Sequence, residues 1–274
     1  MIRIVIAIAV IFLFTISCNT NPPVSPDITP TGNIALNIQV DNSDRISSAA
    51  KVVLLEDFAN VSCIPCVASN KVIETVSHSY GPTKLAAIKF PTNFPSPSDP
   101  FYLANKEVCD ERMSYYNIIA APTTILDGTT KLYSLTDTTT LKSAINAKLG
   151  ASPRFGINVT GNFEGDYIIN VSISMIDTNG INLSDLIIHC VVTETDIEFA
   201  TPPGSNGETK FYDVTRLMLP TKEGTTVRQL INQSQLSFQF EDALLSGWNL
   251  EKINSVVYIQ NLATKEVYQA SITF

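Results

Sequence analysis

The chain has 274 residues, of which 45% are hydrophobic and 16% charged, with a formal net charge of −8. This length suits one large domain or two ordinary ones, and the hydrophobic content is enough for real cores. No run or patch of basic residues occurs, which argues against nucleic acid as a partner.

The N-terminus is predicted to be an export signal over residues 1–17. A short basic start at Arg3 precedes an almost wholly apolar run to Ile16, and this run is shorter than the about 20 residues that a transmembrane helix needs. The junction Thr15-Ile16-Ser17-Cys18 resembles a bacterial lipobox, so Cys18 is the expected lipidation site and the membrane anchor is a lipid. An ordinary secretory signal with a nearby cysteine is the alternative. By resemblance to lipoproteins, Asn19 favours the outer membrane of the cell envelope.

Residues 18–46 are predicted to be a tether that holds the folded part away from a membrane. Four prolines within it, at positions 22, 23, 26 and 30, favour an extended chain. Apolar residues then alternate from Ile34 to Val40, which predicts a strand at a domain edge.

The motif Cys63-Ile64-Pro65-Cys66 stands where a buried strand, Val52–Phe58, gives way to a helical pattern, Val67–His78. Two cysteines at this spacing on the first turn of a helix are close enough to bridge, and they are typical of a redox pair. The unpaired N–H groups of a helix N-terminus favour the thiolate of the first cysteine. Cys63 is therefore predicted to be an exposed nucleophile and Cys66 a more buried resolving thiol.

The rest of the first half continues as an α/β pattern. A strand over Leu85–Phe90 is followed by a proline-rich loop (91–100) and a helix (Phe101–Tyr116). Then come a proline loop with a short strand (118–126), a turn at Asp127-Gly128 and a closing helix (Thr138–Leu149). This order predicts one domain over residues 47–150.

The second half, residues 153–274, has mostly strand signals. Seven segments read as strands, and two of them, around Ile169–Met175 and Leu236–Phe240, alternate cleanly. Short strands separated by turns predict a β-sandwich. The segment Tyr212–Pro220, with Arg216, is interpreted as a strand and its turn rather than as a binding surface.

Three features resemble the thioredoxin fold. Asp57 lies six residues before Cys63, the CxxC opens the first helix, and Ala121-Pro122-Thr123 is similar to the cis-proline loop that faces the redox pair. Ser62 departs from the usual Trp before the first cysteine, and Ile64 departs from the usual Gly.

The whole chain resembles the twenty-eight-kilodalton outer-membrane-protein family of Gram-negative bacteria. The resemblance rests on the export signal, the stretch Val53–Phe58 before the CxxC, the stretch Tyr212–Pro220 and the ending Val256–Val267. It implies a thioredoxin-like α/β domain followed by an all-β, immunoglobulin-like sandwich.

Two functions follow from these residues. In the first, a membrane-anchored oxidoreductase exchanges protein thiols and disulfides: Cys63 attacks, Cys66 resolves, and Asp57 or Glu56 relays a proton. In the second, the chain is a non-catalytic outer-membrane lipoprotein, a binding or assembly module, and the CxxC disulfide is structural.

Other residues have assigned roles in the first function. A cis bond at Pro122 would set the backbone of Ala121 beside the sulfurs, and Ala121, Ile64 and Pro65 would contact an extended protein substrate. No cofactor is expected. No metal is expected either, because His189 and Cys190 are neighbours on a strand and point to opposite faces, so both cannot easily reach one ion. Cys190 is predicted to be a buried inert thiol, and a Cys109–Cys190 bridge is left open.

Overall fold

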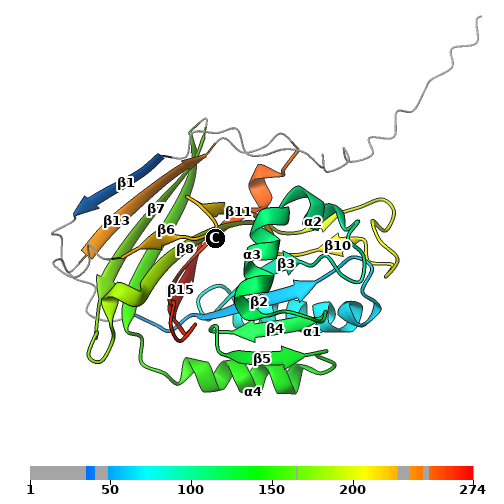
Figure 1. Cartoon of the computed structure of the whole chain (residues 1–274), viewed down its shortest axis with the longest axis horizontal. Coiled ribbons are helices and arrows are strands. Elements are labelled where there is room, and N and C mark those ends of the chain that lie inside the picture. Colours follow the sequence, from blue (N-terminus) through cyan, green and yellow to red (C-terminus); the bar gives the residue numbers. More distant parts are fainter. Residues whose placement is uncertain (1–34, 41–48, 165, 228–234, 243–246, 274) are drawn as a thin grey trace, which may run out of the picture.

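The computed structural model describes residues 35–40, 49–164, 166–227, 235–242 and 247–273, which form a mixed α/β structure (Figure 1). The predicted signal, Cys18 and all of the tether except residues 35–40 lie outside the described residues. Among the residues described, no helix is both long and apolar enough to cross a membrane.

A nine-stranded sheet is the main layer of the structure. Strand β12 (Thr225–Thr226) pairs with β8 beside the main path. From edge to edge, the other strands are β15 (Val267–Ile272), β14 (Ile253–Asn261), β8 (Leu186–Glu194), β11 (Val214–Leu219), β3 (Leu85–Pro91), β2 (Val53–Ala59), β4 (Thr123–Leu126) and β5 (Thr130–Tyr133).

This sheet contains strands from both halves of the chain, which the sequence did not predict. The two sets meet where β11 pairs with β3 in parallel, with Val214 opposite Lys89. Without β11, the edge of β3 would present unpaired backbone groups to solvent, so the second half covers it. Residues 47–150 and 153–274 thus contribute strands to one sheet. That they are two domains stays a prediction.

A second sheet has four strands in the order β1-β13-β7-β6. Strands β6 (Phe155–Glu164) and β7 (Asp166–Met175) form an antiparallel hairpin. Strand β13 (Gln235–Asp242) pairs with β7, and β1 (Ala35–Val40) adds to its outer edge, as the alternating pattern from Ile34 predicts. A short hairpin, β9 (Ile197–Glu198) with β10 (Lys210–Phe211), stands apart from both sheets.

The helices cover the α/β half of the large sheet on both faces. The described α-helices and 3-10 turns are α1 (Ile64–Tyr80), α2 (Pro100–Ala104), α3 (Lys106–Tyr116), α4 (Thr138–Leu149) and the 3-10 turns Leu183–Asp185 and Leu250–Lys252. Side chains alternate along β2, so Val53 and Leu55 pack with α1 and α4, while Leu54 and Phe58 pack with α3.

Two sheets packed face to face make up the other half, as a sandwich prediction requires. Their shared core includes Val171 of β7, Val192 of β8 and Val257 of β14, all fully buried. On the far face of the large sheet, Val191, Met218 and Val256 join the core under α3. The mixed α/β class and the sandwich are therefore present.

Two helix predictions have different outcomes. The helix Thr138–Leu149 has the predicted bounds, and Asp137 caps it by accepting a hydrogen bond from the Thr140 amide. The single helix predicted over Phe101–Tyr116 is wrong, because Asn105 has φ −144° and ψ 42° and separates α2 from α3. That backbone conformation lies outside the α region.

Candidate functional site

The predicted CxxC lies at the start of α1. Cys63 is the N-cap residue of α1, and Pro65 stands in the first turn, where a missing N–H costs no hydrogen bond. The Cys63 amide donates to the Asn60 carbonyl at 3.0 Å, and the Cys66 amide donates to the Cys63 carbonyl at 3.1 Å. The placement of the motif at a strand-to-helix junction is confirmed.

Cys63 and Cys66 form a disulfide, with their Cα atoms 5.3 Å apart. Cys63 is only 2% exposed and Cys66 is fully buried, so the expectation of an exposed Cys63 is wrong. Ala59 packs in the same small cluster, and Ala121 packs against it. The apolar side chains beside the sulfurs therefore exclude solvent from both cysteines.

The loop before Cys63 is held from the first half of the chain. Asn60 donates through its side chain to the carbonyls of Thr92 (2.6 Å) and Ser96 (2.9 Å). Asp99 accepts from the Val61 amide at 2.8 Å while capping α2. Burial raises the pKa of Asp99, and these backbone N–H bonds act in the opposite direction. The approach of the chain to the disulfide is therefore fixed by buried hydrogen bonds.

The loop with Pro122 lies against the disulfide, as the resemblance implies, and the Ala121-Pro122 peptide bond is cis. Among the described residues, none makes a hydrogen bond to the backbone amide or carbonyl of Ala121. Ile64 is 70% exposed, Ile119 is 81% exposed, and Pro65 is exposed as well. The structure thus brings the three predicted substrate-contact residues, Ala121, Ile64 and Pro65, to one surface; that they bind a substrate stays a prediction.

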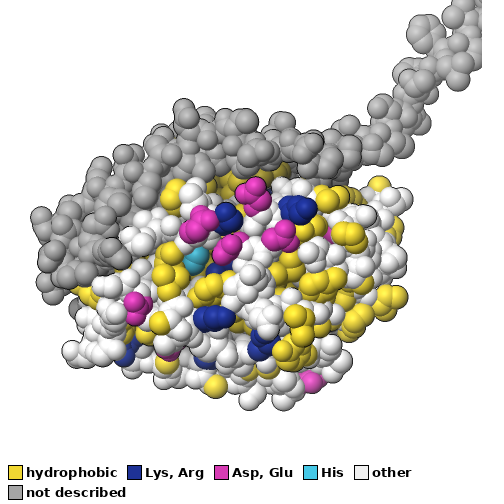
Figure 2. All heavy atoms as spheres, viewed as in Figure 1, with side chains coloured by type: hydrophobic (Ala, Val, Ile, Leu, Met, Phe, Trp, Pro, Cys, Tyr) yellow, Lys and Arg dark blue, Asp and Glu magenta, His cyan; other side chains and the backbone are white. Residues whose placement is uncertain are grey.

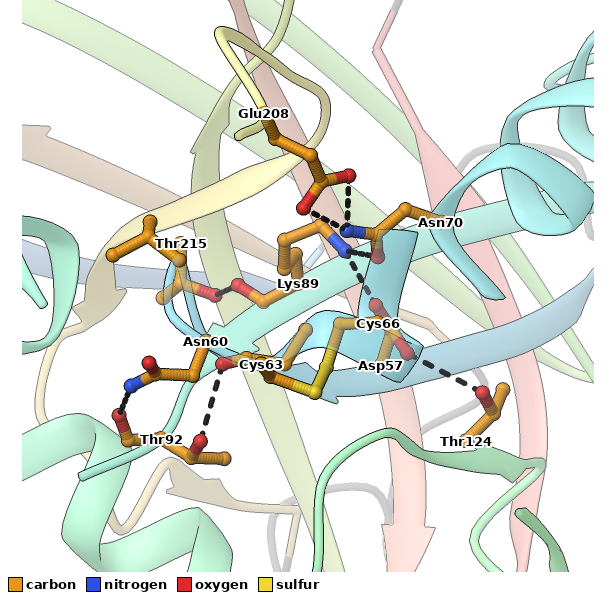
Figure 3. A network of polar contacts seen from close by, with 12 residues as sticks. Asp57, Asn60, Cys63, Cys66, Asn70, Lys89, Thr92, Thr124, Glu208 and Thr215 are labelled. Carbon is orange, nitrogen blue, oxygen red and sulfur yellow. Dashed lines mark hydrogen bonds and ion pairs between the residues drawn. A yellow bond between two sulfur atoms is a disulfide. The ribbon is translucent and has the colours of Figure 1, made fainter. Parts of the chain in front are cut away.

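The two acids of β2 point to opposite faces, and neither meets water. Asp57, 1% exposed, is ion-paired with Lys89 and accepts a hydrogen bond from Thr124 Oγ1 at 3.3 Å (Figure 3). Glu56, fully buried on the other face, is ion-paired with Arg112. A water-facing carboxylate is therefore excluded for both, and a proton relay by Asp57 stays a prediction.

The ion pair of Asp57 continues into a longer polar network that the sequence did not predict. Lys89 Nζ also donates to Asn70 Oδ1 at 2.6 Å, and Asn70 lies four residues after Cys66 on α1. Asn70 Nδ2 donates to both carboxylate oxygens of Glu208, at 2.8 and 3.0 Å (Figure 3). Lys89, inside the apolar strand Leu85–Pro91, is the residue from which this network could have been predicted, because a buried charge needs a partner.

The two remaining described cysteines are free and buried. Cys190 belongs to the core between the sheets, whereas Cys109 belongs to the core under α3, so no bridge joins them. Burial raises the pKa of each thiol far above its ordinary value. Inert thiols are the result, as predicted for Cys190.

No group of three or more His, Cys, Asp or Glu side chains in the described part of the chain is placed to hold a metal ion. Burial holds the pKa of His189 well below its usual range, and Cys190, next to it on β8, faces the other core. The absence of a metal and of a cofactor stays a prediction, as does the absence of a nucleic-acid partner. On the face shown in Figure 2, Lys and Arg side chains are scattered among acidic and hydrophobic ones.

Comparisons with known proteins show the fold. No protein-family model matches the chain, and no curated protein is similar enough to match it. HBP35 of Porphyromonas gingivalis is similar in structure, with a TM-score of 0.68 and 14% identity over 82% of this chain and 76% of that one. A protein of Agrobacterium tumefaciens gives a TM-score of 0.54 and 15% identity over 82% of this chain and 94% of that one.

A third solved structure is a domain of the outer membrane lipoprotein Omp28 from P. gingivalis. It has 15% identity over 44% of this chain and 86% of that one, with a TM-score of 0.30. At these identities, the likeness to the other two structures shows a shared fold and says nothing of activity.

Proposed function

We propose that the chain is a non-catalytic, lipid-anchored protein of the bacterial cell envelope that binds other proteins, and that its Cys63–Cys66 disulfide is structural. One observation carries this proposal. The cysteines are 2% and 0% exposed, whereas Ile64 between them is 70% exposed. An apolar side chain is therefore accessible to a partner at this surface, and the sulfur atoms are buried.

The chemistry of this surface fits an extended apolar segment of another protein. Ile64 lies between the two cysteines, Ile119 lies two residues before Ala121, and both side chains are exposed. Exposed apolar side chains that form a patch mark contact sites. Ala121 packs against the disulfide, and no described residue bonds to its backbone amide or carbonyl, so we propose that these groups pair with a strand-like partner. Main-chain hydrogen bonds would supply affinity, and the two isoleucines would select apolar side chains.

A structural disulfide at this position has a definite energetic role. Closing a loop of four residues restricts the unfolded chain and contributes about 2 kcal/mol in the loop-entropy model. Such a bond persists in an oxidising compartment, which agrees with the predicted export signal and with Cys18 as the lipidated residue. The outer membrane, as destination, follows from the same N-terminal residues.

The proposal includes a thioredoxin-like origin for the first half. The chain order β2-α1-β3, followed after α2 and α3 by β4-β5-α4, is the order that the resemblance implies. In this reading the fold supplies the scaffold, the second half supplies an immunoglobulin-like sandwich, and the exchange chemistry is lost.

Capture of partners under non-reducing conditions tests this function. The full chain carrying Cys63→Ser and Cys66→Ser together is expected to retain its partners, while Ile64→Asp with Ile119→Asp is expected to lose them. Leu250→Asp is the matched control, since Leu250 is an exposed apolar side chain (46%) of the second half. Partners that disappear with the two cysteines and persist with the two aspartates would contradict the proposal.

Thiol–disulfide exchange is the second candidate function. The buried pair of Asp57 and Lys89, on the strands that flank the CxxC helix, favours it, because such a pair can hold and return a proton. The Cys63 thiolate would attack a client disulfide and expel one client thiolate. The Cys66 thiolate would then displace the second, which closes the Cys63–Cys66 bond, oxidises the chain and reduces the client by two electrons. Insulin reduction by the wild type, lost in Cys63→Ser, would establish this activity.

A further inference from the structure

A segment of the second half lies directly against the CxxC loop. We call residues 201–209, between β9 and β10, the strap. The Asn206 amide donates to the Val61 carbonyl at 3.1 Å, and the Ser205 amide donates to Ser62 Oγ at 3.3 Å. A Cβ atom at Gly204 would lie 2.3 Å from the Val61 carbonyl oxygen, so this close approach requires glycine.

Side chains of the strap also hold the first turn of α1. Asn206 Nδ2 lies 3.4 Å from each of the carbonyl oxygens of Asn60 and Cys63 and donates to Glu208 at 2.6 Å. The Glu208 amide donates back to Asn206 Oδ1 at 2.9 Å. Through Asn70, Glu208 is connected to Lys89 and to the buried acid of β2 (Figure 3).

The base of the strap is anchored in its own apolar cluster. Phe101 of α2 meets Phe199 and Phe211 edge-on, with ring centroids 5.6 and 5.0 Å apart. Val61 belongs to the same cluster, and the Phe199 amide donates to the Thr209 carbonyl at 2.8 Å. The strap is thus held both at its base and at its tip.

We propose that the strap is a clamp that controls access of reductants to the Cys63–Cys66 disulfide. The strap makes hydrogen bonds to residues 60–63 from the second half of the chain, and Asp99 accepts one from the Val61 amide from the first half. A thiolate must reach Cys63 Sγ in line with the S–S bond, so a fixed CxxC turn slows the attack. The inference rests on the proposed function only in that the disulfide is a stable part of the folded protein.

The step that the clamp slows is the reduction of the Cys63–Cys66 bond by a dithiol. One thiol of dithiothreitol first gives its proton to the buffer. The resulting thiolate attacks Cys63 Sγ and breaks the Cys63–Cys66 bond, and the expelled Cys66 thiolate takes up a proton from the buffer. The second thiolate of the reductant then closes its own ring and expels the Cys63 thiolate. Two electrons pass to the protein, and the reductant becomes a cyclic disulfide.

Reduction by dithiothreitol in native buffer, followed by alkylation and mass spectrometry of the peptide with Cys63, tests the clamp. In one variant, an Asn-Gly turn replaces residues 200–208 and joins Phe199 to Thr209 as a two-residue hairpin. In a second variant, Asn206→Ala removes only the side-chain bonds. Ser205→Ala is the matched control, because its side chain is exposed and only its backbone amide bonds to Ser62.

We expect Asn206→Ala to be reduced about tenfold faster than the wild type, the effect of losing about one net hydrogen bond. The shortened variant should be reduced faster still, and Ser205→Ala should keep the wild-type rate. Equal rates for wild type and Asn206→Ala, with unchanged melting temperatures, would overturn the proposal, even where the shortened variant fails to fold. The proposed function is tested separately, since its outcome is partner capture and not the rate of reduction.

Discussion

Arg112 joins the two halves of the molecule, and its removal is the most informative perturbation of the fold. Its side chain is 2% exposed and donates to Glu56 on β2, to Tyr116 Oη at 3.1 Å, and to Gln260 Oε1 on β14 at 3.4 Å. The guanidinium also lies 4.8 Å from the ring centres of both Tyr115 and Tyr116. The variant Arg112→Met keeps much of the apolar stem and removes the charge.

The expected loss follows from what remains behind. Glu56 is fully buried, and without Arg112 the only hydrogen bond to its carboxylate from a described residue is that from Tyr116 Oη, at 2.6 Å. An uncompensated buried charge of this kind costs about 3 to 5 kcal/mol in the free energy of unfolding. Adding Glu56→Gln to Arg112→Met removes that charge, so the double variant should recover a large part of the loss.

Urea unfolding followed by circular dichroism measures these free energies. Arg154→Met is the matched control, because Arg154 pairs with Asp177 at 3.7 Å on the surface and should cost about 1 kcal/mol or less. A loss below 1 kcal/mol for Arg112→Met, or a double variant less stable than the single one, would refute the assignment of Arg112 as a buried charge that needs its partner.

Three further predictions concern pH, backbone and domain structure. Burial raises the pKa of Asp213 from 3.8 to about 6, so the unfolded chain releases this proton first and the wild type loses stability as pH rises through that window. Asp213→Asn should therefore gain stability relative to the wild type between those two pH values, in urea titrations; a difference independent of pH would contradict this. Gly128→Ala should lower the free energy of unfolding by more than about 1 kcal/mol, and by more than Gly180→Ala does. Both glycines have φ above 70°, but only at Gly128 would a Cβ lie 1.8 Å from the Lys265 carbonyl oxygen. Equal melting temperatures for the two variants would refute this prediction. Residues 47–150 alone should show no cooperative unfolding, because β3 would lose β11 and Arg112 would lose Gln260; a sharp urea transition would show an independent domain.

Sequence patterns predicted the helices and strands that depend on neighbouring residues. The closing helix Thr138–Leu149 was predicted with its bounds, and alternation along β2 sends Asp57 and Glu56 to opposite faces. The break at Asn105 was missed, because apolar residues continue at helical spacing across it. Nothing local to Val214 indicates that it pairs with Lys89, 125 positions earlier in the chain.

The candidate site follows the same division. The resemblance to the thioredoxin fold implied that the loop with Ala121 and Pro122 faces the CxxC, and the structure packs Ala121 against the two cysteines. The burial of Cys63 was not predicted, because it depends on Ala121, which lies far from the CxxC in sequence and packs against the cysteines. The strap was not predicted, because residues 201–209 reach the CxxC loop from the other half of the chain. Turn-forming residues in that segment indicate a loop and do not reveal which surface it covers.

The central claim is that the disulfide is structural and its sulfur atoms are withheld from clients. Expression of the full chain with Cys66→Ser in the bacterial envelope, followed by non-reducing electrophoresis, tests it most directly. Cys63 would then be a free thiol at a site that is 2% exposed. Our account predicts a single monomeric band. A ladder of mixed disulfides that depends on Cys63 and disappears with reductant would contradict it and establish exchange as the function.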